Sequence, residues 1–253
     1  MKIGVFDSGI GGLTVLKNLI EANLFSEIIY YGDTARVPYG NKDKETIIRF
    51  SLEALDFFAK FDIDLLVIAC NTASAYALKP MQKIANFPII GVVESGILSL
   101  SNKIKNKQDS ILIIATKATI KSGIYERNLR KLGYKNITSL QTGLFVPLVE
   151  EGIFSGEILE ASFRHYFSDK FDSEMPKAII LACTHFPLIK NQISSYFDNK
   201  PILIHSGEAI VEFLSKHKNI TPTPKKGKAK IHFYASGDKK ALESYAKSWL
   251  KSY

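Results

Sequence analysis

The chain has 253 residues, an apolar fraction of 46% and a formal net charge of +8, from 33 Lys and Arg against 25 Asp and Glu. This length allows one large domain or two ordinary ones with real cores, and no apolar run reaches the roughly 18 residues that span a bilayer. Residues 2–6 resemble a strand rather than a signal peptide, so we expect a cytoplasmic protein without a membrane segment.

Apolar runs typical of strands alternate with longer stretches of helical periodicity. The predicted strands are 2–6, 27–31, 64–69, 88–92, 110–114, 136–140, 177–182, 201–204 and 230–235. The predicted helices are 11–22, 43–60, 73–85, 94–105, 119–132, 155–167, 187–197, 207–217 and 238–250. Runs such as 65–68 are apolar on both faces, as in parallel strands buried between helices. We therefore expect an α/β fold of mainly parallel sheets flanked by helices.

A coarse internal repeat suggests two halves. Twice, a strand with a small polar turn is followed, after further βα units, by a strand that ends in a cysteine. The chain could cross between halves at 91–94 and 204–207, which predicts two pseudo-symmetric domains, 1–92 plus 207–253 and 93–206. Ligands of open α/β sheets bind at the carboxyl ends of the strands, so we expect the active site in the cleft between the domains.

The positive charge could serve a nucleic acid, an anionic small molecule or simply solubility. The basic cluster Lys225, Lys226, Lys228 and Lys230 follows a Thr-Pro-Thr-Pro stretch at 221–224, and we interpret this region as a solvated linker. The sequence has no nucleic-acid-binding motif, and its aromatic residues do not alternate with basic ones. We therefore do not expect a nucleic acid to be the main partner.

Residues 7–12, Asp-Ser-Gly-Ile-Gly-Gly, join the first predicted strand to the first predicted helix. The glycines could let backbone N–H groups approach a ligand at the positive end of a helix, or could simply form a tight turn. Their spacing is neither that of a Rossmann fingerprint nor that of a P-loop. Asp7 lies at the mouth of the predicted sheet, where its carboxylate could hold an ammonium group or orient a thiol.

The two cysteines, Cys70 and Cys183, end similar apolar strands, within Leu-Val-Ile-Ala-Cys-Asn-Thr at 66–72 and Ile-Ile-Leu-Ala-Cys-Thr-His at 179–185. We do not expect a disulfide in the cytosol, and two cysteines so far apart are a poor zinc signature. Each precedes a predicted helix, whose amino end should favour the thiolate. A lone buried cysteine can be a mere small hydrophobic residue, but the matched settings indicate a functional pair.

A matched pair of thiols favours proton transfer over nucleophilic hydrolysis, which needs one thiol and a separate base. If the thiols flank one carbon, one removes a proton and the other delivers one, which inverts the stereocentre. His185 could help to move the proton of Cys183. Asn71, Thr72 and Thr184 offer short hydrogen-bonding groups that suit a carboxylate.

These motifs together resemble those of the cofactor-independent aspartate/glutamate racemases. The matching segments, in the family order, are 7–12, 37–40, 69–73, 146–150 and 183–188. The resemblance implies a two-domain enzyme that interconverts L- and D-glutamate, needs neither pyridoxal phosphate nor metal, and supplies D-glutamate for peptidoglycan synthesis. It also implies a homodimer.

The resemblance further assigns roles to residues. Cys70 and Cys183 match the two catalytic acid/bases, Asp7 matches a carboxylate near Cys70, and Glu150 and His185 match an assisting pair near Cys183. The residues that match substrate contacts are Asp7, Ser8, Tyr39, Gly40, Asn71, Thr72, Thr119, Thr184 and His185. The segment that contains Thr119 departs from the family pattern at one position, because Ala115 occurs where the family more often has glycine. Motif alignment favours Glu150 over the adjacent Glu151, although either could be a solvated helix charge.

Two other enzymatic activities stay open. An aspartate racemase would share the thiol pair and differ mainly in the pocket for the distal carboxylate, and the segments 38–40 and 183–185 favour glutamate. A decarboxylase or isomerase on a related scaffold would need only one thiol.

Overall fold

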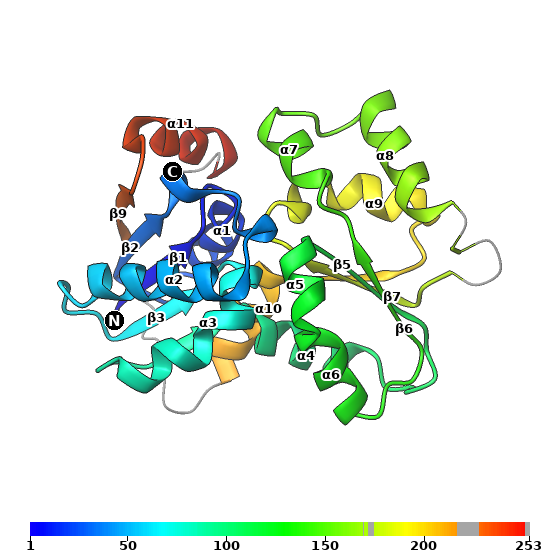
Figure 1. Cartoon of the computed structure of the whole chain (residues 1–253), viewed down its shortest axis with the longest axis horizontal. Helices are drawn as coiled ribbons and strands as arrows, with labels where there is room; N and C mark the ends of the chain where they lie inside the picture. The colour runs from blue at the N-terminus through cyan, green and yellow to red at the C-terminus, as the bar shows by residue number, and fades with distance from the viewer. Residues whose placement is uncertain (169, 172–174, 217–227, 251–253) are drawn as a thin grey trace.

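The computed structural model describes residues 1–168, 170–171, 175–216 and 228–250. The predicted linker at 221–224 and the first two lysines of the basic cluster lie outside these ranges. Two sheets stand next to each other, and helices cover both faces of each (Figure 1).

Every strand pairing within the two sheets is parallel. The first sheet has the order β4-β3-β1-β2-β9, with β1 (Lys2–Asp7), β2 (Glu27–Gly32), β3 (Leu65–Ile68), β4 (Ile89–Gly91) and β9 (Lys230–Ala235). The second has the order β6-β5-β7-β8, with β5 (Ile111–Ala115), β6 (Ile137–Gln141), β7 (Ala178–Ala182) and β8 (Ile202–His205). The arrangement β4-β3-β1-β2 recurs as β8-β7-β5-β6, which confirms the predicted pseudo-symmetric α/β architecture. β9 extends the first sheet beside β2.

The helices mostly follow the predicted segments. They are α1 (Leu13–Glu21), α2 (Lys44–Phe58), α3 (Asn71–Ile84), α4 (Val92–Lys103), α5 (Lys117–Ser122), α6 (Ile124–Lys131), α7 (Phe145–Glu150), α8 (Glu157–Phe167), α9 (Lys190–Tyr196), α10 (Ser206–Lys216) and α11 (Lys239–Leu250). Short 3₁₀ helices are η1 (Thr34–Arg36), η2 (Tyr39–Asn41) and η3 (Phe186–Ile189).

The helix predictions differ from the structure in three places. The predicted helix 119–132 is divided into α5 and α6 by Gly123, whose φ of 63° lies in the left-handed region that ends helices. The predicted helix 187–197 begins as the 3₁₀ turn η3 before it continues as α9. The helix α7 was not predicted, because six residues that include Pro147 are too few to show helical periodicity.

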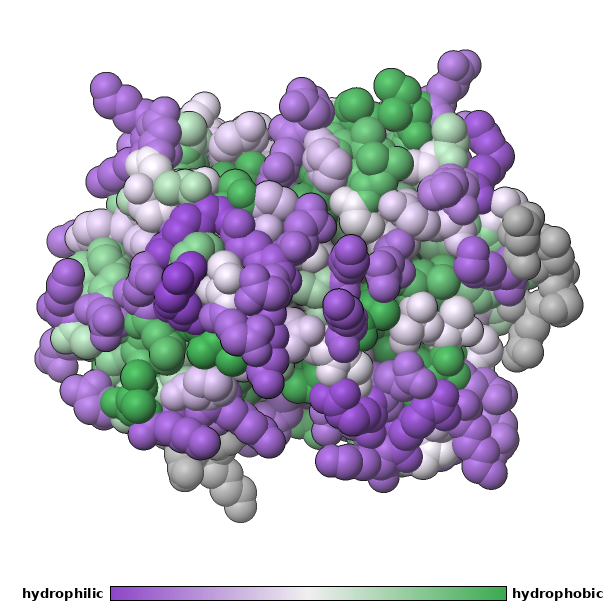
Figure 2. Space-filling model, viewed as in Figure 1, coloured by the Kyte–Doolittle hydropathy of each residue, from purple (hydrophilic) through white to green (hydrophobic). Residues whose placement is uncertain are grey.

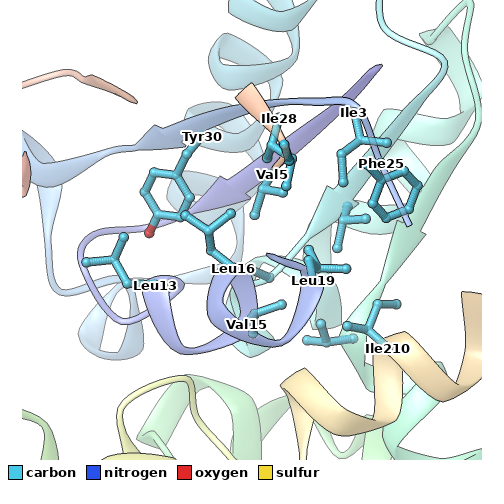
Figure 3. Packing of buried hydrophobic residues seen from close by; sticks show 14 of the residues in the cluster. Ile3, Val5, Leu13, Val15, Leu16, Leu19, Phe25, Ile28, Tyr30 and Ile210 are labelled. Carbon is cyan, nitrogen blue, oxygen red and sulfur yellow. The ribbon is translucent and has the colours of Figure 1, made fainter. Parts of the chain in front are cut away.

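Each sheet is packed between two apolar layers. Side chains of β1 and β2, such as Val5 and Ile28, meet Leu16 of α1, and Ile210 of α10 closes the same layer (Figure 3). The opposite face of the first sheet packs against α2 and α3, and the second sheet is covered by α7, α8 and α9 on one face and by α4 and α6 on the other. This burial holds the strand ends rigidly, which is what a catalytic constellation requires.

The register of the strands determines which residues meet at the sheet edges. Phe6 pairs with Ile68, and Ala115 pairs with Ala182, so Ser8 comes level with Cys70 and Thr116 with Cys183. Matched positions of the repeat therefore carry the two thiols. The boundaries 1–92 plus 207–253 and 93–206 stay a proposal, supported by which strands join which sheet.

The surface is mixed in polarity. Figure 2 shows a mostly hydrophilic face with separate apolar patches, one of them over the region of α7 and α8, where Leu144 and Ile158 are exposed. In the described part of the chain, none of the helices combines the length and apolarity needed to cross a membrane.

Candidate active site

A cavity of about 370 Å³ receives residues from the carboxyl ends of both sheets. They follow β1, β2 and β3 in the first sheet and β5, β6 and β7 in the second. The lining residues are Ser8, Val37, Pro38, Tyr39, Gly40, Asn41, Cys70, Asn71, Thr72, Thr116, Gly143, Val146, Pro147, Glu150, Cys183, Thr184 and His185. The structure thus brings both thiols to one cavity.

Cys70 caps the amino end of α3 and is almost completely buried. Its Sγ lies 3.4 Å from Ser8 Oγ and accepts a hydrogen bond from the backbone N–H of Ala73 at 3.4 Å. Burial, followed by the negative charge of Asp7, raises the pKa of the Cys70 thiol to about 12, even though the hydrogen bonds with Ser8 and Ala73 act to lower it. The amino end of α3 thus favours the thiolate, as expected, but desolvation outweighs this effect and the net shift favours the protonated thiol.

Asp7 ends β1 and has no exposed surface. Its Oδ2 accepts a hydrogen bond from the backbone N–H of Gly9 at 2.9 Å, and the side chain is not part of the cavity lining. Burial raises the pKa of Asp7, while the Gly9 hydrogen bond and the charge of His185 oppose this shift. The carboxylate thus lies behind Cys70, where it influences the thiol electrostatically.

Cys183 belongs to a different group of side chains. Its Sγ lies 3.8 Å from Nδ1 of His185, and Nε2 of His185 lies 3.0 Å from Oε1 of Glu150 on α7. Burial opposes a charged imidazole, but the hydrogen bonds to Cys183 and Glu150 outweigh it and raise the pKa of His185 to about 10. A protonated His185 between a carboxylate and a sulfur stabilises negative charge on that sulfur.

The glycines of residues 7–12 are absent from the cavity lining, which only Ser8 of this segment joins. A Cβ on Gly11 would lie 2.4 Å from Thr184 Oγ1 and 2.6 Å from Cε1 of His185. A Cβ on Gly12 would lie 2.4 Å from the Cβ of Asp7. These glycines therefore let the turn pack closely against site residues, which favours the tight turn over ligand contact among the two alternatives.

Three threonine hydroxyls form a cluster beside Cys70. Thr72 Oγ1 lies 3.0 Å from Thr116 Oγ1 and 2.9 Å from Thr119 Oγ1, and the last two lie 3.0 Å apart. Thr72 and Thr116 line the cavity, whereas Thr119 lies behind them with 2% of its surface exposed. Thr119 therefore orients the other two hydroxyls rather than lining the cavity.

A loop after β2 supplies another wall. The hydroxyl of Tyr39 donates a hydrogen bond to Asp33 Oδ2, and Asp33 also binds Arg36 Nε at 2.8 Å. Asp33 has no exposed surface. Gly40 lies so close to the second sheet that a Cβ there would be 2.6 Å from the Cβ of Thr116. Asp33 thus anchors a loop that reaches across the cavity.

Of the site residues predicted from sequence, ten line the cavity and two, Asp7 and Thr119, lie directly behind it. Sequence reasoning missed Thr116, which a polar residue directly after a predicted strand could have indicated. It also missed Asp33, whose role depends on the distant fold of its loop. Asn41 and Gly143 carry no recognisable signal. Among the described residues, no group of three or more His, Cys, Asp or Glu is arranged to hold a metal ion.

Comparison with known proteins shows similarity over the whole chain. Residues 3–214 match the family model described as Asp/Glu/Hydantoin racemase. The chain is 59% identical to the glutamate racemase of Campylobacter jejuni over 250 residues, 99% of this chain and 98% of that protein. The crystal structure of the Campylobacter jejuni subsp. jejuni glutamate racemase matches with a TM-score of 0.95 and 58% identity, over 100% of this chain and 99% of that one. The glutamate racemase of Francisella tularensis in complex with D-glutamate matches with a TM-score of 0.88 and 35% identity, over 99% and 94% of the two chains.

Proposed function

We propose that this chain, which belongs to the Asp/Glu/Hydantoin racemase family, interconverts L- and D-glutamate by proton transfer between its two cysteines. One observation carries the proposal: Cys70 and Cys183 line the same cavity from equivalent strand ends of the two sheets. Two acid/base groups on opposite sides of one α-carbon are what inversion by deprotonation and reprotonation requires.

The unlike surroundings of the thiols assign their resting roles. Cys70, with a pKa of about 12, keeps its proton at neutral pH and acts as the acid. Cys183 faces His185, which carries a proton at neutral pH, and acts as the base. After one turnover, Cys70 has given its proton to the α-carbon and Cys183 has taken one. The reverse direction exchanges these roles.

The cavity lining can recognise an anionic amino acid mainly through uncharged hydrogen-bonding groups. Among the described residues that line it, Glu150 is the only carboxylate, it is paired with His185, and there is neither Lys nor Arg. Thr72 and Thr116 offer hydroxyls, and the amino end of α3 points its backbone N–H groups toward the site. Preorganised donors of this kind stabilise the charge that develops on the substrate carboxylate as the α-proton leaves.

The assignment of glutamate over aspartate rests on the loop that carries Tyr39 and Gly40 and on the named activity of the relatives. This loop adds a wall to the cavity, where a longer side chain could place its distal carboxylate. On the resemblance, we further propose a cofactor-independent homodimer that supplies D-glutamate for peptidoglycan synthesis, and on the sequence we propose a cytoplasmic location.

Incubation of the protein with L-glutamate in D₂O, without added cofactor, tests the function. We expect D-glutamate that carries one deuterium at Cα, because the proton is delivered by a thiol that has exchanged with solvent. L-aspartate should be converted roughly 10- to 200-fold less efficiently, the usual discrimination for one methylene. Chiral chromatography with mass spectrometry measures both.

Three results would overturn the proposal. Racemisation of aspartate but not glutamate would indicate the related aspartate-specific activity. Strict dependence on added pyridoxal phosphate would exclude thiol-only chemistry. Release of carbon dioxide without an inverted product would indicate a single-thiol decarboxylase.

Replacement of Tyr39 by phenylalanine tests the anchor of the loop. We expect the KM for glutamate to rise roughly 3- to 10-fold, about 1 kcal/mol of lost binding, because the ring is no longer held by Asp33. Tyr134→Phe is the matched control, since its hydroxyl also makes a buried hydrogen bond, to the carbonyl of Ile104, outside the cavity lining. Equal KM values in the two variants would contradict the role of the anchor.

A further inference from the structure

The residue directly after each cysteine accepts a hydrogen bond from a helix that packs on the other sheet. Asn71 follows Cys70, and its Oδ1 accepts a hydrogen bond from the hydroxyl of Tyr125 at 2.6 Å. Tyr125 belongs to α6, and its ring packs in the apolar layer on the second sheet. Asn71 Nδ2 also donates to Oγ of Ser206, the first residue of α10, at 3.0 Å. The side chain of Asn71 thus ties the helix that carries Cys70 to the second sheet.

A second contact runs in the opposite direction. Thr184 follows Cys183, and its backbone carbonyl accepts a hydrogen bond from Oγ1 of Thr14 at 2.7 Å. Thr14 lies on α1, which packs on the first sheet, and it is buried. Gly11 supports the same contact, since its missing side chain lets the turn before α1 touch Thr184 and His185.

The two contacts are related by the internal repeat. Each starts one residue after a cysteine, and each ends on a hydroxyl of a helix that packs on the opposite sheet. In both, the hydroxyl is shielded from water, so each bond constrains its partner more than an exposed one would. A shift of either sheet relative to the other would break one bond or both, and it would carry the adjacent thiol with it.

We propose that the bonds Tyr125–Asn71 and Thr14–Thr184 set the distance between the two thiols, so that Tyr125 and Thr14 are positioning residues for the second proton transfer. This inference rests on the proposed two-thiol racemisation. Inversion needs both sulfurs near one carbon at the same time, whereas deprotonation alone needs only one. A displacement of about 1 Å at a reacting group can cost about 100-fold in rate.

Tyr125→Phe and Thr14→Val remove one hydroxyl each, and the assay follows both products of the carbanion in D₂O. If the second thiol is displaced, the thiol that removed the proton exchanges it with D₂O and then returns deuterium to the same face. We expect racemisation to fall roughly 10- to 100-fold with little change in KM. We also expect the ratio of deuterium in recovered substrate to inverted product to rise at least about 10-fold, by the same displacement.

Two controls separate positioning from loss of stability. Thr14→Ser keeps the hydroxyl and should restore the wild-type ratio of exchange to inversion. Tyr134→Phe loses a buried hydroxyl elsewhere and should leave that ratio unchanged. A wild-type ratio in folded Tyr125→Phe and Thr14→Val would overturn this inference while leaving the racemase function intact. Failure of the wild-type protein to racemise glutamate would instead overturn the function itself.

Discussion

Replacing either cysteine by serine lowers the rate of glutamate racemisation roughly 1,000-fold, within the range expected for loss of a general acid or base. A serine hydroxyl fits the space of a thiol, but it is a much weaker acid and cannot hold the negative charge that proton abstraction requires. Both sulfurs line the cavity, so each substitution removes one of the two proton-transfer groups without emptying the core. Circular-dichroism melts should show that both variants remain folded.

The two serine variants should differ in hydrogen exchange. Cys70→Ser keeps Cys183 with His185 and Glu150, so at neutral pH it still exchanges the α-hydrogen of one enantiomer with D₂O. Cys183→Ser keeps only Cys70, whose pKa of about 12 leaves little thiolate, so exchange of the other enantiomer is slow and rises with pH. NMR of each recovered enantiomer measures this. Racemisation within tenfold of wild type in either variant would contradict the two-thiol mechanism.

Replacing Glu150 by glutamine is expected to lower racemisation roughly 10- to 100-fold, equivalent to the 1.5–3 kcal/mol of a hydrogen bond to a charged group. Glu150 Oε1 lies 3.0 Å from His185 Nε2, and its charge favours the protonated imidazole. Glu151→Gln is the matched control, because the neighbouring carboxylate is exposed and outside the cavity lining. Equal rates in the two variants would refute the role of Glu150.

Glu150→Gln should also change the pH dependence of the reaction. In the wild type, His185 has a pKa raised to about 10, so it keeps its proton below that pH and loses it above. Without the Glu150 carboxylate this pKa falls, so the proton is lost at lower pH. The ratio of kcat/KM for the wild type to kcat/KM for Glu150→Gln should therefore increase as the pH rises from neutral toward about 10. A pH profile parallel to that of the wild type would contradict this coupling.

Much of the fold follows from local sequence patterns. Runs such as 65–68 are apolar on both faces, which is possible only between two helical layers, and the repeated cysteine strands predicted the repeated sheet order. The errors were also local. Gly123 ends a helix that periodicity would continue, and α7 is too short to show a period.

The candidate site was less completely predictable. Sequence motifs identified both thiols, the pair His185 and Glu150, and most of the lining. They did not identify Thr116 as a wall, Asp33 as the anchor of Tyr39, or Thr119 as a support behind the cavity. These roles depend on which side chains come into contact when loops fold against elements that are distant in the sequence. A sequence motif contains no information about such contacts.

The sequence by itself determined the alternation of strands and helices, the matched placement of Cys70 and Cys183 and the family resemblance, because these depend on residues near each other along the chain. The resemblance already paired Asp7 with Cys70, and Glu150 and His185 with Cys183, but only the tertiary structure decided how these neighbours and burial affect each thiol. Desolvation and Asp7 keep the proton on Cys70, while His185 and Glu150 support charge at Cys183. Burial and contacts between the two sheets cause this difference, and both exist only after the chain has folded.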